Sequence, residues 1–224
     1  MKNNIVIVIP AYNEEKTIRE VIEDAKKVTD EIIVVDDGSR DRTGEIAKSH
    51  GAQVYRHLIN LGLGGALKTG FAASLKKDDF IVVTLDADGQ HEASVVSKLV
   101  EPIKNGEADV VIGSRLLNEN VKMPFIRLIF NHLANLITFL FYGLFVSDSQ
   151  SGLRAFSRYA LEKIKLKGLK MEVSSEIIGE IKRNNLSLKE IPIRAIYTDY
   201  SLSKGQNFWL GIKTFFRILI DKMT

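Results

Sequence analysis

Cysteine is absent from this chain of 224 residues, which excludes disulfide bonds and thiolate metal sites and is compatible with a reducing, intracellular setting. A large excess of one charge is also lacking, because 31 Lys and Arg are offset by 28 Asp and Glu, for a formal net charge of +3. No basic run is interleaved with aromatic residues, so nucleic acid is not an expected partner. The first residues, MKNNIVIVIPAYNEE, contain only a short apolar run and no small-residue cleavage site, and they indicate a buried strand rather than a signal peptide.

Long apolar runs are scarce as well. The longest, residues 136–146, covers about half of the length that a membrane-spanning helix needs. The surrounding stretch 124–146 is strongly apolar, but polar residues at intervals of four share one helical face: Arg127, Asn131 and Asn135. This pattern favours an amphipathic helix at a membrane interface, and residues 206–224 show a similar two-faced pattern. A spanning helix and an ordinary core helix remain alternatives.

What the chain does contain is an alternation of short apolar runs with stretches of helical period, which predicts an α/β fold with a mostly parallel sheet. The runs rich in Val and Ile are residues 5–9, 32–35, 80–85 and 110–112. Residues 15–28 and 91–106 carry apolar side chains on one helical face, with Gly106 as an expected stop. We expect one domain over residues 1–224, with 124–146 and 206–224 as membrane-interface helices.

Polar motifs follow three of these four runs: PAYNEE, DDGSRDRT and DADGQH. In open sheets of this class, ligands bind beyond the carboxyl ends of the strands. Asp86 and Asp88 leave one strand end, and with Gln90 they offer the oxygen ligands that Mg²⁺ and Mn²⁺ prefer, usually shared with substrate phosphates. The alternative is that the two aspartates only close a surface turn.

Two further segments carry both structural and functional interpretations. Ser39 or Asp41 is expected to cap the helix that follows, whereas Asp36 and Asp37 are available to a nucleoside base or ribose. The glycine cluster LGLGGALKTG does not match a phosphate-binding loop, because Leu67 stands where the known patterns need a small residue. It indicates either close helix packing or a loop whose backbone lies against a nucleotide or sugar.

Taken together and in order, the motifs PAYNEE, VVDDGSRDRT, GLGGALKTG, DADGQH, GSR and SGLRAF resemble the inverting family 2 glycosyltransferases of GT-A fold. They are most similar to the dolichyl-phosphate or polyprenyl-phosphate hexose synthases, over residues 5 to about 204. The resemblance implies transfer of a hexose from a nucleotide-diphosphate sugar (UDP-glucose, UDP-N-acetylglucosamine or GDP-mannose) to dolichyl or polyprenyl phosphate. It also implies Mg²⁺ or Mn²⁺ as cofactor and a peripheral location at the cytoplasmic face of the cell membrane.

The same resemblance implies roles for individual residues. The nucleotide sugar is expected to contact Pro10, Tyr12, Glu14, Asp37, Lys68, Asp86 and Ala87. The metal is expected to bind Asp86, Asp88 and Gln90. The acceptor phosphate is expected at Arg115, Arg127 and Asn131, although Arg115 also fits a purely structural salt bridge. The residues expected to act in catalysis are Asp88, Arg115, Glu176 and Lys204, with Glu176 in an orienting role and Lys204 near the leaving diphosphate.

One departure from the family pattern bears on the donor. Mannose synthases commonly carry an Arg and a Gly-Glu pair where this chain has TDYSL, which favours a UDP-linked sugar over GDP-mannose. Two other functions stay open on sequence grounds. One is a soluble glycosyltransferase that acts on a saccharide hydroxyl and needs a general base. The other is a non-catalytic module that binds a membrane surface.

Overall fold

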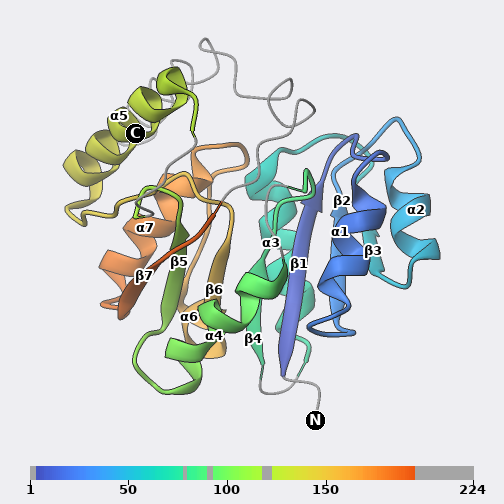
Figure 1. The fold of residues 1–224 in the computed structure, drawn as a ribbon, viewed down its shortest axis with the longest axis horizontal. Helices are drawn as coiled ribbons and strands as arrows, with labels where there is room; N and C mark the ends of the chain where they lie inside the picture. The colour runs from blue at the N-terminus through green and yellow to red at the C-terminus, as the bar shows by residue number, and fades with distance from the viewer. Residues whose placement is uncertain (1–3, 78–79, 90–92, 118–122, 195–224) are drawn as a thin grey trace.

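A sheet of seven strands with helices on both faces forms the body of the protein (Figure 1). A computed structural model describes residues 4–77, 80–89, 93–117 and 123–194. The strand order is β3-β2-β1-β4-β6-β5-β7, and only β6 runs antiparallel to its neighbours. The mostly parallel α/β architecture predicted from the sequence is therefore confirmed. The strands are β1 Ile5–Ala11, β2 Ile32–Asp36, β3 Gln53–Arg56, β4 Ile81–Thr84, β5 Val110–Ser114, β6 Arg154–Ser157 and β7 Leu188–Pro192.

Helices cross over between most of these strands. Their bounds are α1 Ile18–Ala25, α2 Thr43–Ser49, α3 Leu63–Ser74, α4 Val96–Lys104, α5 Phe125–Tyr142, α6 Arg158–Lys163 and α7 Val173–Arg183, with a short 3₁₀ turn at Ala93–Val95 before α4. The periodicity of residues 15–28 is explained by α1, which buries Ile18, Ile22 and Ala25 against the sheet. Beyond α4, Gly106 has φ +70°, a left-handed conformation that glycine adopts without steric cost, as predicted for a helix stop.

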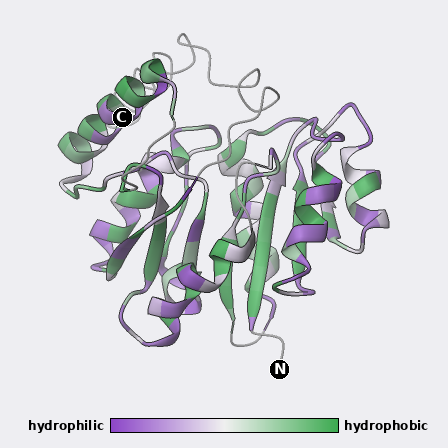
Figure 2. Cartoon of the chain, viewed as in Figure 1, coloured by the Kyte–Doolittle hydropathy of each residue, from purple (hydrophilic) through white to green (hydrophobic). Residues whose placement is uncertain are grey.

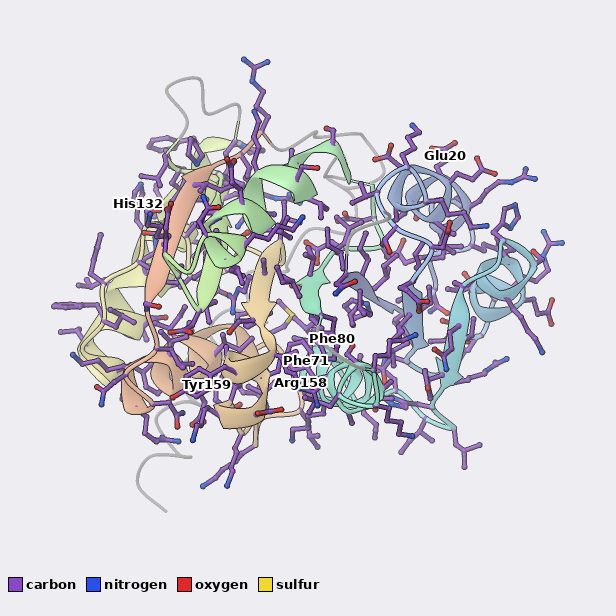
Figure 3. The ribbon with its side chains drawn as sticks, turned by 90° about the horizontal axis from the view of Figure 1, so that it is seen from below. Glu20, Phe71, Phe80, His132, Arg158 and Tyr159 are labelled. Carbon is purple, nitrogen blue, oxygen red and sulfur yellow. The ribbon has the colours of Figure 1, made fainter. Side chains whose placement is uncertain are left out.

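The core is divided by the sheet into two layers because successive strand residues point to opposite faces. On β1, Ile5, Ile7 and Ile9 pack with α1, α2 and α4, whereas Val6 and Val8 pack with α3, α6 and α7. The second layer includes an edge-to-face ring pair, Phe71 with Phe156, at 5.3 Å between centroids. The guanidinium of Arg158 lies 5.4 Å from the centroid of Phe80, in the region labelled in Figure 3.

Helix α5 is set apart from the two core layers (Figure 1). Only two of its side chains are buried, Asn135 and Thr138, and the Thr138 hydroxyl is 2.8 Å from that of Ser175 on α7. Its other side is a row of large apolar residues that are 42–75% exposed, visible as the green outer helix in Figure 2: Phe125, Ile126, Ile129, Leu133, Leu136, Phe139 and Leu140. This helix turns its polar side toward the protein, which is the reverse of an ordinary core helix.

Candidate active site

The loops that follow β1 and β2 meet at the carboxyl edge of the sheet. The backbone N–H of Asn13 donates to Ser39 Oγ at 3.0 Å, and that of Glu14 donates to Thr43 Oγ1 at 2.8 Å. In return, the N–H of Arg40 donates to Asn13 Oδ1 at 2.9 Å. The PAYNEE and DDGSRDRT motifs are thereby joined into one surface, on which Tyr12 is exposed and Pro10 and Glu14 are partly buried.

The expectation that Ser39 or Asp41 caps α2 needs correction. The residue at the N-cap position is Arg42, and no side chain accepts the capping hydrogen bond there. Ser39 is instead committed to the PAYNEE loop. Asp41 accepts from the backbone N–H of Thr43, at 3.0 Å, and from its hydroxyl. For Ser39, tertiary contact with the β1 loop therefore takes the place of the expected local cap, whereas Asp41 still accepts from the N–H of the first helical residue.

Asp37 is buried at the end of β2, and its carboxylate accepts three hydrogen bonds. Oδ1 accepts from His57 Nδ1 at 2.7 Å and from the backbone N–H of Leu61 at 2.9 Å, and Oδ2 accepts from the N–H of Gly62 at 2.7 Å. Asp37 therefore fixes the loop after β3. The neighbouring Asp36 is fully buried, and its Oδ1 accepts from the N–H of Ser39 at 2.9 Å.

The glycine cluster at the start of α3 packs against backbone from another part of the chain. A Cβ at Gly64 would overlap with the carbonyl oxygen of Gly168, and one at Gly62 would lie 2.7 Å from the carbonyl oxygen of Leu169. The N–H of Gly65 donates to that same carbonyl at 3.0 Å. These contacts support the packing interpretation of the cluster. Lys68, which lies in α3, donates from Nζ to the carbonyl of Lys167 in the same distant segment at 2.6 Å.

Asp86 follows β4 and lies directly against Gly152, two residues before the start of β6. Both of its carboxylate oxygens occupy the space that a Cβ at Gly152 would need. Burial raises the pKa of Asp86 above its ordinary value, although the positive charges of Arg115 and Arg154 oppose that rise. The negative charge of Glu14 also raises the pKa of Asp86. Ala87 is buried and Asp88 is partly exposed.

The donor atoms at this edge fit a hard divalent cation, since carboxylate oxygens are the ligands that Mg²⁺ and Mn²⁺ prefer. Among the described residues, no group of three or more His, Cys, Asp or Glu side chains is arranged to hold a metal. Asp86 and Asp88 as metal ligands stay a prediction, and two carboxylates would suit an ion that completes its shell with water and substrate phosphate. The expected third ligand, Gln90, lies outside the described residues, as does Lys204.

Arg115 follows β5 and makes a two-pronged ion pair with Asp148. Arg115 Nε and Nη2 donate to the two carboxylate oxygens at 2.7 and 2.8 Å, and the backbone N–H of Arg115 donates at 3.0 Å. Asp148 is fully buried, while the Arg115 side chain keeps 16% of its surface exposed. The structural interpretation of Arg115 thus has a defined partner, and the exposed part of its side chain leaves a surface for a ligand.

The loop that carries Asp148 is held by α5. The N–H of Ser149 donates to Asn135 Oδ1 at 2.8 Å, and Asn135 Nδ2 donates back to the carbonyl of Ser147. Arg127 and Asn131, the other expected acceptor residues, are partly buried on the same side of α5. The structure therefore places the expected acceptor residues of α5 on the helix side that also binds the Arg115–Asp148 loop.

Glu176 lies in the first turn of α7, and both of its carboxylate oxygens accept from backbone. Oε1 accepts from the N–H of Lys167 at 2.6 Å, and Oε2 accepts from the N–H of Gly168 at 2.9 Å. Because Gly168 and Leu169 in turn contact the glycines of α3, Glu176 holds the loop that covers the start of α3. The orienting role expected for Glu176 in catalysis stays a prediction.

Sequence reasoning missed three residues of this region. Asp148 and His57 did not stand out because their partners, Arg115 and Asp37, are distant in sequence, and Arg154 did not because its partners are backbone carbonyls. Arg154 is the only buried Lys or Arg in the part of the chain that the structure describes, and burial lowers its pKa to about 10. It donates to the carbonyls of Ser149 and Ser151 at 2.6 and 2.8 Å. The one available signal was its place in the motif SGLRAF.

Comparison with known proteins gives relatives over almost the whole chain. A protein from Methanocaldococcus jannaschii, MJ1222, is 48% identical over 99% of this chain and 93% of its own length. The UDP-N-acetylglucosamine–dolichyl-phosphate N-acetylglucosaminyltransferase of Methanococcus voltae is 39% identical over 98% of this chain and 96% of its own. The glucosyl-3-phosphoglycerate synthase of Mycobacterium tuberculosis, solved with Mn²⁺ and UDP-glucose, superposes with a TM-score of 0.72 and 25% identity, covering 97% of this chain and 77% of that one. The family model for glycosyl transferase family 2 matches residues 6–165, and this chain therefore belongs to that family of glycosyltransferases.

Proposed function

We propose that this glycosyltransferase moves one hexosyl group from a nucleotide-diphosphate sugar to a polyprenyl phosphate, with inversion at the anomeric carbon. One observation carries the proposal: polar contacts connect the candidate donor site to α5. Asn135 of α5 bonds the loop 147–149, and Asp148 in that loop holds Arg115, whose charge acts on Asp86. The outer side of the same helix is apolar, as the acceptor's hydrocarbon chain requires.

The donor is a UDP-linked sugar, N-acetylglucosamine or glucose. Support comes from the Methanococcus voltae relative, whose name specifies UDP-N-acetylglucosamine and dolichyl phosphate. The TDYSL stretch, which lacks the Arg and Gly-Glu pair of mannose synthases, favours the same choice over GDP-mannose. The nucleoside lies over the joined loops of β1 and β2, against Pro10, Tyr12, Glu14 and Asp37, with Lys68 and Ala87 farther along the donor.

Asp86 and Asp88 hold the divalent cation together with Gln90, and the cation, Mg²⁺ or Mn²⁺, neutralises charge on the leaving diphosphate when it is bound. The presence of Mn²⁺ with UDP-glucose in the Mycobacterium tuberculosis structure supports this assignment. Lys204 supplies a second positive charge to the diphosphate. Asp88 is therefore needed for catalysis rather than for the fold.

Arg115 receives the acceptor phosphate together with Arg127 and Asn131. The carbon–oxygen bond to the acceptor phosphate forms as the anomeric bond to the diphosphate breaks. A phosphate monoester has a second pKa near ~6 and is largely ionised at neutral pH, so its oxygen attacks without a general base. Glu176 agrees with this scheme, because its two oxygens are engaged by backbone N–H groups.

The enzyme lies at the cytoplasmic face of the membrane as a peripheral protein. Helix α5 has the length and mean hydropathy, 1.4 over its 18 residues, of a helix that can cross a bilayer. Its inward polar side, bonded to the loop 147–149, instead supports a helix that lies in the interface with its apolar side in the lipid. Residues 206–224, the second interfacial segment in this proposal, lie outside the described residues.

The test is transfer from a radiolabelled panel of UDP-N-acetylglucosamine, UDP-glucose and GDP-mannose in the presence of Mn²⁺. Each donor is paired with a short-chain polyprenyl phosphate, with the same polyprenol lacking the phosphate, and with 3-phosphoglycerate. We expect a lipid-linked product only with the polyprenyl phosphate and a UDP-sugar. Product on 3-phosphoglycerate but not on polyprenyl phosphate would assign a soluble hydroxyl acceptor instead, as in the enzyme of similar fold.

A further inference from the structure

We propose that His57 is a positioning residue for the donor site, which fixes the Asp37 carboxylate and the loop 57–62 as one wall of the nucleoside pocket. This inference rests on the proposed function, because it assigns Asp37 to the nucleoside. His57 follows β3, Asp37 follows β2, and Thr69 lies on α3. Three separate elements therefore meet in one chain of hydrogen bonds.

The geometry of this chain is tight at both nitrogens of the imidazole. His57 Nδ1 is 2.7 Å from Asp37 Oδ1, and His57 Nε2 is 2.8 Å from Thr69 Oγ1. The side chain of His57 is 12% exposed and that of Asp37 is 5% exposed. Donation from Nδ1 to the carboxylate leaves Nε2 of a neutral ring as the acceptor of the Thr69 hydroxyl. With both nitrogens engaged, the ring has a single orientation.

Asp37 is consequently fixed from several directions. A carboxylate offers about four acceptor positions, and three are taken by His57 and by the N–H groups of Leu61 and Gly62. The remaining position has a fixed direction at the carboxyl end of β2, where ligands of open α/β sheets bind. An N–H of a base or a hydroxyl of ribose is the chemistry that such a position accepts.

The backbone of this loop packs closely against the turn after β2. Gly38 has φ +73°, and a Cβ there would lie 2.7 Å from the carbonyl carbon of Ile59 and 2.8 Å from the backbone nitrogen of Asn60. Leu58 and Ile59 are nonetheless largely exposed, so packing of their side chains does not hold the loop. Backbone contact at Gly38 and the bonds to Asp37 do so, and one of those bonds comes from His57.

Two replacements of His57 separate the two bonds. His57→Asn places an amide near the position of Nδ1 and can still donate to Asp37, whereas His57→Gln reaches toward Thr69 and loses that donor. We expect His57→Gln to weaken binding of UDP with Mn²⁺ by about tenfold, and His57→Asn by no more than about threefold. The donor KM should follow the same order, with turnover at saturating substrate little changed. His50→Gln, at the exposed end of α2, is the matched control and should bind as the wild type does.

Binding is measured by calorimetry and folding by thermal melting. If wild-type protein binds neither UDP nor GDP, the proposed function fails. If it binds UDP and His57→Gln binds equally well, or if the Asn and Gln variants lose the same affinity, the inference about His57 is wrong. If His57→Gln melts at a much lower temperature, Thr69→Val provides the decisive test. An affinity loss of about threefold that Thr69→Ser restores supports the chain of hydrogen bonds from Thr69 through His57 to Asp37. Unchanged affinity in Thr69→Val overturns it.

Discussion

Arg115 and Asp148, 33 residues apart in sequence, are joined by three hydrogen bonds, two from the guanidinium and one from the backbone N–H of Arg115. Asp148 has no exposed side-chain surface, so this carboxylate does not itself reach a ligand in solvent. Asp148 therefore sets the direction of the Arg115 side chain without touching the acceptor. The geometry of the proposed acceptor site depends on that direction.

Asp148→Asn should therefore damage both stability and acceptor use. Removing one charge of a buried pair leaves the other uncompensated, which costs about 3–5 kcal/mol of unfolding free energy. Chemical denaturation gives this value, and the KM for polyprenyl phosphate should rise while UDP affinity stays near that of wild type. Glu162→Gln is the control, because the Arg158–Glu162 pair is exposed, and it should cost no more than about 0.5 kcal/mol. An equally small effect for Asp148→Asn would contradict the assignment.

Asp88→Asn should abolish transfer and leave the fold intact. The substitution keeps the side-chain volume but removes charge from a divalent site, and Asp88 is partly exposed at a strand end, where stability depends little on it. We expect unchanged thermal melting and a loss of transfer rate of about a hundredfold or more. Near wild-type turnover at low metal concentration would show that Asp88 does not bind the metal.

Asp86→Asn should lose activity but gain stability in metal-free protein. The pKa of Asp86 is raised in the folded state by burial, so the folded protein binds a proton that the unfolded chain has already released. Between the unfolded and the raised folded pKa, stability falls as pH increases, and above both values the full cost of the buried charge remains. An uncharged Asn avoids that cost. Melting in EDTA at neutral pH should thus give a higher Tm for Asp86→Asn than for wild type, and addition of Mn²⁺ with UDP should stabilise only the wild type.

Much of the fold could be predicted because β1 and β2 are continuous runs of Val and Ile that are buried on both faces. The edge strand β3 and the strand β6 could not, since QVYR is half exposed and RAFS places an arginine in the middle of a sheet. Arg154 is tolerated there because its guanidinium donates hydrogen bonds to the backbone carbonyls of residues 149, 151 and 174. Every residue type offers a backbone carbonyl, so the side-chain pattern of the sequence does not reveal these partners.

The site divides in the same way. Motif residues that follow strands, such as Asp37 and Asp86, could be predicted because each strand end is marked in the sequence by the change from a run of apolar residues to a polar motif. Their supporting residues could not, because His57 lies 20 residues from Asp37 and Gly152 meets Asp86 only through the antiparallel pairing of β4 with β6. Ser39 illustrates the converse: a good local capping residue binds a tertiary partner instead, the N–H of Asn13.

Glu176 separates a phosphate acceptor from a hydroxyl acceptor. Glu176→Gln leaves one backbone N–H without its acceptor, so we expect a loss of about 1–3 kcal/mol in stability and a higher donor KM. Turnover at saturating substrates should stay within about tenfold of wild type, because an ionised phosphate needs no base. A loss of turnover of about a hundredfold or more, with the donor KM unchanged, is the behaviour of a general base and would favour the saccharide hydroxyl.

The outer side of α5 is suited to the membrane interface. A polyprenyl chain stays in the bilayer, so the enzyme reaches its phosphate only at the level of the headgroups, and α5 offers the apolar surface for that position. Phe125, Ile126 and Leu140 are 75%, 68% and 71% exposed, and full transfer of such side chains from water contributes about 1.5–3 kcal/mol each.

Changing Phe125, Ile126 and Leu140 to serine should therefore reduce flotation of the protein with anionic vesicles by at least about tenfold, without changing UDP affinity or Tm, because none of the three packs in the core. The control changes Tyr159 and Leu169 to serine, which are exposed residues outside α5, and it should float like the wild type. If wild-type protein fails to float at low salt, the interfacial position is wrong and an acceptor in solution is favoured. If it floats and the α5 variant floats equally, α5 does not carry the binding, even though it is the only helix in the described ranges that is long and apolar enough to cross a bilayer.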